Sequence, residues 1–133
     1  MQYLYLNIPI KIMKPKTLLI ADDEDLNFHL LKELLSDFSF NIIRATNGKE
    51  AVEICKTNKQ INIVIMDMRM PEMDGYEATQ RIMEFMPNLP IIALTAYVTS
   101  KEKNKVIACG CSDYISKPID QELLISKIKE HLQ

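Results

Sequence analysis

The 133-residue sequence lacks several features that would assign it to a specialised class of protein. No apolar run reaches the roughly 20 residues that a membrane-spanning helix needs. The net charge at pH 7 is only −2, so bulk electrostatics give no reason to expect nucleic-acid binding. Lysines follow the first apolar stretch instead of preceding it, which is not the order of a signal peptide. The chain is 47% hydrophobic and 26% charged, and we expect one globular domain with one core.

Cysteine is also scarce, because the chain has only three. An odd number cannot pair completely within one chain, so the count favours free thiols in a reducing cytoplasm. Cys109-Gly110-Cys111 has metal-like spacing, but no further Cys or His lies near it in sequence. We interpret these residues as small, partly buried thiols beside a turn.

Four short apolar runs each end in a chemically reactive residue. These runs are Leu18–Asp23, Ile63–Asp67, Ile91–Thr95 and Asp113–Pro118. In a parallel sheet the carboxyl ends of all strands lie along one edge. Three carboxylates, one hydroxyl and one ammonium group would therefore meet in a single crevice, where they could hold a divalent cation and a phosphoryl group together.

Strand-like and helix-like segments alternate from Thr17 onward. The expected strands are short, apolar and rich in Ile, as is typical of strands buried on both faces: Thr17–Ala21, Asn41–Ala45, Ile61–Met66, Ile91–Leu94 and Tyr114–Ser116. Five successive β–α units predict a doubly wound α/β domain with a five-stranded parallel sheet and five helices. The spacing favours strand order 2-1-3-4-5, with strands 1 and 3 adjacent at the switch point.

The expected helices carry clear start signals. Asn47, Asp74, Thr99 and Asp120 stand where N-cap residues belong. The first helix should bury a stripe of leucines, namely Leu26, Leu30, Leu31, Leu34 and Leu35, and the last should bury Leu123, Leu124, Ile128 and Leu132. Residues 1–16 do not fit the repeat, so we interpret them as a tail or the remnant of a preceding domain, with the domain itself covering 17–133.

The crowded carboxylates at the strand ends suggest a specific chemistry. Asp22, Asp23 and Asp67 would repel one another unless a cation lay between them, and Mg²⁺ prefers such hard oxygen ligands. A carboxylate can also attack phosphorus to form an aspartyl phosphate, with Lys117 and Thr95 neutralising the transferred oxygens. A cis Lys117–Pro118 bond would aim the lysine into the crevice, although most such bonds are trans. For Asp22 or Asp23 alone, capping of the first helix would be a sufficient explanation.

These residues resemble the receiver domain of two-component response regulators, over about Thr17 to Leu132. The matching segments occur in order at the spacing of that family: Asp22-Asp23, Met66–Gly75, Leu94-Thr95-Ala96 and Tyr114–Pro118. The resemblance implies the flavodoxin-like form of the doubly wound fold. No core position of the family is missing, so a receiver that cannot be phosphorylated is not expected.

The resemblance also implies a role for each site residue. Asp67 resembles the phosphoacceptor. Asp22 and Asp23 resemble the acidic pair that positions Mg²⁺, with Asp23 as the direct ligand, and the backbone carbonyl of Arg69 resembles a further ligand.

Three further positions resemble the residues of this family that contact the phosphoryl group or respond to it. Lys117 resembles the lysine that contacts it, and Thr95 resembles the switch hydroxyl. Tyr114 resembles the aromatic residue that swings inward when the hydroxyl engages. Arg69 and Tyr97 occupy positions thought to tune the phosphoryl lifetime.

A finer resemblance concerns the receivers of hybrid sensor histidine kinases. It is carried by Asp22–Asn27, Ala93–Ala96 and Asp113–Asp120, and Tyr3–Pro9 resembles the last strand of a kinase ATP-binding domain. The resemblance implies phosphorylation by a histidine kinase or by its own parent kinase, and relay to a histidine phosphotransfer protein. We expect no nucleic-acid partner, no membrane contact by this domain, no output domain after Leu132, a monomer or weak dimer, and a cytoplasmic location.

Other classes of function share parts of this pattern. Haloacid-dehalogenase-like phosphatases also use an aspartate nucleophile and Mg²⁺, but Asn27 replaces the threonine of their motif and there is no room for a cap domain. A flavodoxin-like electron carrier would need a phosphate-cradling loop after the first strand, which is absent. A pure interaction module would use the face formed by the last two helices and the last strand. We therefore expect a switch domain rather than a true enzyme.

Overall fold

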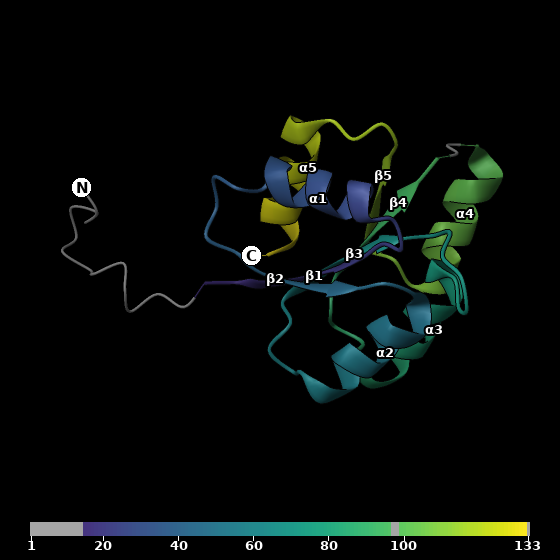
Figure 1. The fold of residues 1–133 in the computed structure, drawn as a ribbon. Coiled ribbons are helices and arrows are strands. Elements are labelled where there is room, and N and C mark those ends of the chain that lie inside the picture. The colour runs from purple at the N-terminus through teal and green to yellow at the C-terminus, as the bar shows by residue number, and fades with distance from the viewer. Residues whose placement is uncertain (1–14, 97–98, 133) are drawn as a thin grey trace.

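The computed structural model of the chain describes residues 15–96 and 99–132, which form a parallel sheet between two layers of helices (Figure 1). The sheet has the order β2-β1-β3-β4-β5. Its strands are β1 (Thr17–Ala21), β2 (Asn41–Ala45), β3 (Ile63–Asp67), β4 (Ile91–Thr95) and β5 (Asp113–Ser116). The doubly wound architecture and the strand order predicted from the sequence are confirmed.

Five helices cover the sheet within the described ranges of the chain. They are α1 (Asp25–Leu34), α2 (Gly48–Thr57), α3 (Gly75–Phe85), α4 (Ser100–Cys109) and α5 (Gln121–His131). Helices α1 and α5 lie on one face, and α2 and α3 lie on the other with α4 beside them (Figure 1). None of the helices in the described part of the chain is long and apolar enough to cross a membrane.

Alternate residues of the strands supply two separate apolar cores. Leu18 and Ile20 of β1 pack in the core beneath α1 and α5. Leu19 and Ala21 pack in the core beneath α2, α3 and α4. All five residues of β1 are buried, as the continuous apolar run predicted.

The predicted N-caps are present. The side chains of Asn47, Asp74 and Thr99 accept hydrogen bonds from the backbone N–H three residues later, at 2.8, 2.9 and 3.1 Å. Asp120 caps α5 by accepting from the N–H of Glu122 at 3.0 Å. These bonds satisfy donors that a helix start otherwise leaves unpaired.

The leucine stripe predicted for α1 is wrong in part. Leu26 is 81% exposed and Leu30 is 49% exposed, whereas Phe28 and Leu31 are buried. The buried face therefore follows Phe28, Leu31 and Leu35, which also have helical spacing. In α5, Leu124 and Ile128 are buried as expected, but Leu123 is 41% exposed.

The strand boundaries differ slightly from those predicted, and the differences concern the reactive residues. Strand β3 begins at Ile63 rather than Ile61 and continues through Asp67, and β4 continues through Thr95. Asp67 pairs in register with Leu94, and Thr95 pairs with Ser116. The two residues are thus held by the sheet itself and not by the loops that follow.

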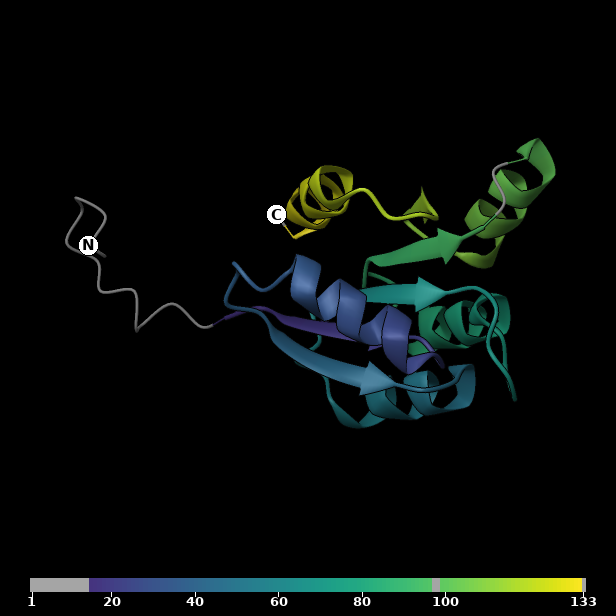
Figure 2. The same cartoon turned by 45° about the horizontal axis from the view of Figure 1, so that its top comes forward.

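All five strands run in the same direction, so the sheet has two chemically different edges (Figure 2). Asp22, Asp67 and Thr95 lie at the carboxyl edge, while β1 begins and α5 ends at the opposite edge. Residues 1–14 of the predicted N-terminal tail, which was expected to cover 1–16, lie outside the described residues, and so does Tyr97.

Candidate functional site

Three carboxylates meet where β1 and β3 end. One oxygen from each of Asp22, Asp23 and Asp67 lies within 4.8 Å of the others. The parallel register that pairs Ala21 with Met66 explains this, because the next residue of each strand is an aspartate. The convergence predicted from the strand ends is confirmed.

Asp22 is the most deeply buried member of the group, with no exposed surface. Its Oδ1 accepts a hydrogen bond from the N–H of Glu24 at 3.0 Å, while Oδ2 is buried and has no hydrogen-bond partner among the residues that the structure describes. Burial raises the pKa of Asp22, the N–H of Glu24 opposes this, and the nearby Asp67 adds to the increase. A buried carboxylate oxygen without a hydrogen-bond donor has the chemistry of a metal ligand.

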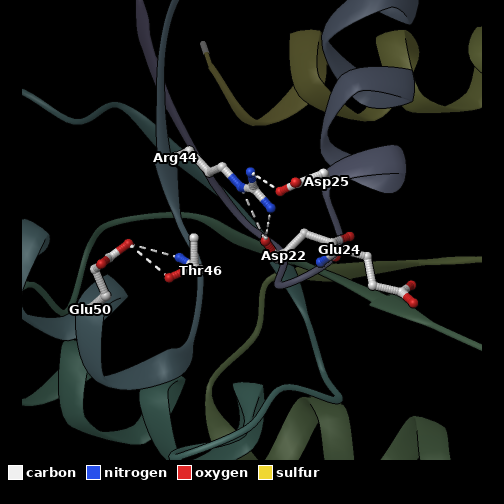
Figure 3. Close-up of polar contacts among 6 residues, drawn as sticks. All are labelled: Asp22, Glu24, Asp25, Arg44, Thr46 and Glu50. Carbon is white, nitrogen blue, oxygen red and sulfur yellow. Dashed lines mark hydrogen bonds and ion pairs between the residues drawn. The ribbon is translucent and has the colours of Figure 1, made fainter.

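Arg44 of β2 holds the backbone beneath this aspartate (Figure 3). Its Nε and one terminal nitrogen donate to the carbonyl of Asp22 at 3.3 and 3.1 Å, and the other nitrogen donates to Asp25 at 2.7 Å. The guanidinium also lies 4.8 Å from the centre of the Phe28 ring. The strand pattern gave no signal for this role, since Arg44 is a single charge within an apolar run.

A second link fixes the strand-to-helix connection after β2. Glu50 accepts a hydrogen bond from the N–H of Thr46 at 2.8 Å (Figure 3). The side chain of Asn47 accepts from the N–H of Glu50. The two bonds form a reciprocal cap at the start of α2.

Asp67 at the end of β3 faces Lys117. Lys117 Nζ lies 3.4 Å from Asp67 Oδ1, and the Lys117–Pro118 peptide bond is cis. The N–H of Arg69 donates to the same oxygen at 3.3 Å. Burial raises the pKa of Asp67, and the ammonium group of Lys117 partly counteracts that increase.

The loop after Asp67 folds back tightly on the strand. The N–H of Gly75 donates to the carbonyl of Met68 at 3.1 Å. A Cβ atom on Gly75 would lie 2.4 Å from the carbonyl oxygen of Asp67. The residue of this loop with a left-handed backbone is Glu72, with φ of 69°, and not Gly75. Gly75 is needed for close packing instead.

A crevice of about 280 Å³ opens above the carboxylates. Asp23, Asp67, Thr95 and Lys117 all line it, together with Arg69. Five of the seven predicted site residues therefore share one cavity wall, with Asp22 buried beside them.

Tyr114 is the predicted site residue that lies outside the crevice. It is half-buried on β5, and its ring packs against the core beneath α4. Lys103 Nζ and Lys127 Nζ lie 5.7 and 5.1 Å from the ring centre. The residue is therefore in contact with α4 and α5 rather than with the carboxylates.

Two residues lining the crevice were missed by the sequence reasoning. Glu24 and Glu102 both line it, and Glu102 accepts a hydrogen bond from the hydroxyl of Tyr76 on α3. No local pattern in the sequence shows that the start of α4, where Glu102 lies, faces the crevice.

A second group with potential metal ligands lies between β5 and α5. Asp113, Glu130 and His131 place ligand atoms within 4.8 Å of one another. Lys127 Nζ lies 2.6 Å from Asp113 Oδ1, and His131 Nε2 lies 3.0 Å from Asp113 Oδ2. Because its oxygens are already engaged, we interpret Asp113 as part of an ion-pair network.

Comparison with known sequences identifies the family. The model of the response regulator receiver domain matches residues 18–129. The polar-differentiation response regulator DivK of Brucella anthropi is 32% identical over 120 residues, which cover 89% of this chain and 97% of DivK. Hybrid signal transduction histidine kinase I of Dictyostelium discoideum is 36% identical over 128 residues, covering 90% of this chain but 7% of the kinase.

Solved structures agree with this assignment. A putative response regulator from Chloroflexus aurantiacus has a TM-score of 0.84 at 32% identity, covering 90% of this chain and 98% of its own. The receiver domain of sensor histidine kinase PA1611 from Pseudomonas aeruginosa, which has Mg²⁺ in its active-site cleft, has a TM-score of 0.82 at 25% identity, covering 90% and 98%. The receiver domain of Saccharomyces cerevisiae Ssk1, solved with the phosphotransfer protein Ypd1, has a TM-score of 0.81 at 30% identity, covering 87% and 88%. The chain belongs to the response regulator receiver domain family, and it is a signalling domain of phosphorelays.

Proposed function

We propose that Asp67 accepts a phosphoryl group from a phosphohistidine on a histidine kinase or a phosphotransfer protein. A carboxylate oxygen of Asp67 attacks phosphorus, the P–N bond breaks, and the histidine nitrogen keeps the electron pair. The observation that carries this proposal is that Asp67 lies at the end of a buried strand, between Lys117 and the other two aspartates.

Lys117 and Thr95 support the transfer by facing the same crevice. Phosphoryl transfer depends mainly on positioning and on neutralising charge on the transferred oxygens. Lys117 supplies a positive charge 3.4 Å from Asp67 Oδ1. Thr95 also lines the crevice. Its backbone is fixed because it pairs with Ser116 in the sheet.

Asp22, Asp23 and Asp67 would hold Mg²⁺, with the backbone carbonyl of Arg69 as a further ligand. The partnerless Oδ2 of Asp22 and the crowding of three carboxylates fit a hard divalent cation. When bound, the cation supplies positive charge to the phosphoryl oxygens and removes the repulsion between the aspartates. Mg²⁺ in the cleft of the PA1611 receiver supports this assignment.

The phosphorylated state would be reported through Thr95 and Tyr114. Thr95 lies at the end of β4, and Tyr114 lies on the neighbouring β5, paired with Ala93. The ring of Tyr114 lies near Lys103 of α4 and Lys127 of α5. A change in Thr95 would thus shift an existing equilibrium of Tyr114 and of the face formed by α4, β5 and α5.

Acetyl phosphate with Mg²⁺ tests the chemistry directly. The chain should gain one phosphoryl group by intact-mass spectrometry, and Asp67→Asn should gain none. Asp37→Asn is a matched control, because Asp37 is an exposed carboxylate outside the metal group and should leave the gain unchanged. Sustained hydrolysis of phosphate esters without stable modification would instead support the haloacid-dehalogenase-like alternative.

The phosphodonor would dock over α1. This helix begins two residues after Asp23, which lines the crevice, and it exposes the apolar side chains of Leu26 and Leu30. The complex of the Ssk1 receiver with Ypd1 supports a phosphotransfer protein as the partner. Leu26→Glu should slow transfer from a phosphorylated phosphotransfer protein while leaving acetyl phosphate labelling unchanged. Ile107→Glu is the control, since Ile107 is an exposed residue of α4.

The proposal extends to the setting of the domain. The matched region covers nearly the whole length of one relative, the response regulator DivK. In another relative, a hybrid histidine kinase, the matched region is only a small part of the chain. We propose a monomeric or weakly dimeric cytoplasmic domain that acts alone or within a parent histidine kinase. Size-exclusion chromatography and the sequence of the parent gene test these points.

A further inference from the structure

Two cysteine sulfurs lie in contact at the junction between α4 and β5. Cys109 is the last residue of α4 and Cys111 precedes β5, and both are buried as free thiols. Their Sγ atoms are 3.7 Å apart. Neither residue lines the crevice or belongs to the group of carboxylates, so the pair is a feature separate from the phosphoacceptor site.

The backbone between the two cysteines holds the sulfurs on the same side. Gly110 has φ of 113°, a conformation that favours glycine. The N–H groups of Gly110 and Cys111 donate to the carbonyls of Ile107 and Val106 at 3.1 and 3.3 Å, which closes the end of the helix. A Cβ on Gly110 would lie 2.8 Å from Met83 Cγ, so only glycine fits this turn.

The two sulfurs have different chemical environments. Cys109 Sγ lies 3.1 Å from the carbonyl oxygen of Val106, to which its thiol donates, and a hydrogen bond from the thiol of Cys111 lowers the pKa of Cys109 to about 7. The same hydrogen bond, together with burial, raises the pKa of Cys111. A thiolate beside a thiol is the combination from which a disulfide forms, because the thiolate is the nucleophile and the thiol is the resolving group.

We propose that Cys109 and Cys111 form an oxidation site, in which hydrogen peroxide converts the pair to an intrachain disulfide. The Cys109 thiolate attacks one peroxide oxygen, the O–O bond breaks, and hydroxide leaves and takes up a proton as water. The sulfur of Cys111 then attacks the sulfenic acid on Cys109, the S–O bond breaks, and a second water leaves with the Cys111 proton. The two sulfurs lose two electrons, and one peroxide becomes two waters.

The geometry requires only a local adjustment. The Sγ–Sγ distance must shorten from 3.7 Å to about 2.05 Å, and both residues belong to one three-residue turn. Cys109 and Cys111 are 6% and 8% exposed, which admits a water-sized oxidant more readily than a bulky thiol reagent. Thr79 Oγ1, 3.8 Å from Cys111 Sγ, would lose that contact as the sulfur moves.

The third cysteine serves as an internal control. Cys55 lies on α2, is fully buried, and has its pKa raised by burial to about 11. It should therefore remain a thiol under conditions that oxidise the other two.

The test treats the full chain with hydrogen peroxide, quenches it, and measures intact mass and tryptic peptides without reduction. We expect the loss of two hydrogens per chain, a linkage mapped to Cys109 and Cys111, and full reversal by dithiothreitol. Cys55→Ser should react at the wild-type rate. Cys111→Ser should instead leave a sulfenic acid on Cys109 that dimedone traps, and Cys109→Ser should lose the two-hydrogen change entirely.

The outcomes that overturn the proposal are equally specific. They are an unlinked Cys109–Cys111 peptide after oxidation, a linkage between two chains, or a linkage that involves Cys55. Peptide mapping of the wild-type chain decides the matter even where a serine variant fails to fold. Acetyl phosphate labelling of Asp67 should persist in the oxidised protein, so failure of the oxidation site and failure of the phosphoacceptor assignment give separate results.

Discussion

Replacing Asp22 by asparagine should stabilise the metal-free domain, even though it removes a proposed metal ligand. Asp22 is fully buried, its Oδ2 has no partner, and it lies within a group of three carboxylates. A buried unsatisfied polar atom destabilises a protein by about 1–3 kcal/mol. Asparagine keeps the acceptor for the N–H of Glu24, replaces the buried charge by a neutral amide and removes the repulsion from Asp67, so we expect a gain of about 1–2 kcal/mol.

The pH dependence of this gain follows from the pKa of Asp22. Burial raises that pKa in the folded state, so folding favours the protonated carboxyl. The stability from this proton is complete below the ordinary value of 3.8 and is lost as pH rises through the folded value. Asp22→Asn should therefore match the wild type in acid and exceed it increasingly as the pH rises above about 4.

Mg²⁺ should reverse the advantage. Binding to the folded state alone stabilises it by about 2.7 kcal/mol when the free ion is at 100 times its dissociation constant. The wild type should gain this stabilisation, while Asp22→Asn should gain less because it has lost one anionic ligand. The two proteins should thus change order between EDTA and saturating Mg²⁺.

Thermal unfolding followed by circular dichroism measures the effect. For a domain of this size, 1–2 kcal/mol corresponds to a rise in Tm of about 3–10 °C. Asp37→Asn is the control, since this exposed carboxylate should shift neither the Tm nor its response to Mg²⁺. A variant less stable than the wild type in EDTA at pH 7 would refute the argument from repulsion and burial.

Three further changes probe the residues around the crevice. Gly75→Ala should destabilise the domain by about 3 kcal/mol or more in urea titrations, because its Cβ would lie 2.4 Å from the carbonyl oxygen of Asp67. Lys117→Met should reduce the rate of acetyl phosphate labelling at least about tenfold, and an unchanged rate would contradict a role for its charge. Burial raises the pKa of Asp113, but hydrogen bonds from Lys127 and His131 outweigh this and lower the pKa overall. The contribution of the Asp113 carboxylate to stability is present above pH 3.8 and is lost as the pH falls through the pKa of Asp113 in the folded state. Asp113→Asn should therefore be less stable than the wild type by about 1–2 kcal/mol at pH 7 and approach it in acid.

The sequence predicted those parts of the fold that depend on local chemistry. Apolar runs ending in Asp22, Asp67 and Thr95 placed the strands, and the parallel arrangement brought these residues to one edge. The N-caps at Asn47 and Thr99 were also predictable, because a short acceptor side chain can satisfy the nearby backbone donors without help from the rest of the fold.

Features that depend on tertiary packing could not be predicted in this way. The leucines of α1 allow two overlapping apolar faces, and only packing on the sheet selects the one that buries Phe28 and exposes Leu26. The close approach of Gly75 to the carbonyl oxygen of Asp67 is visible only in three dimensions. The contacts of Arg44 with the carbonyl of Asp22 likewise join residues 22 positions apart.

The direction of the last helix has a consequence for how this domain can be combined with others. Strand β1 begins and helix α5 ends at the edge of the sheet opposite the crevice (Figure 2). A linker attached at either end would leave from the edge of the sheet opposite the carboxylates, so it would not have to pass over the crevice. One unchanged module can therefore serve as an independent protein or as a terminal or internal segment of a much longer chain. The same arrangement permits a receiver to be moved between proteins without redesign of its chemistry.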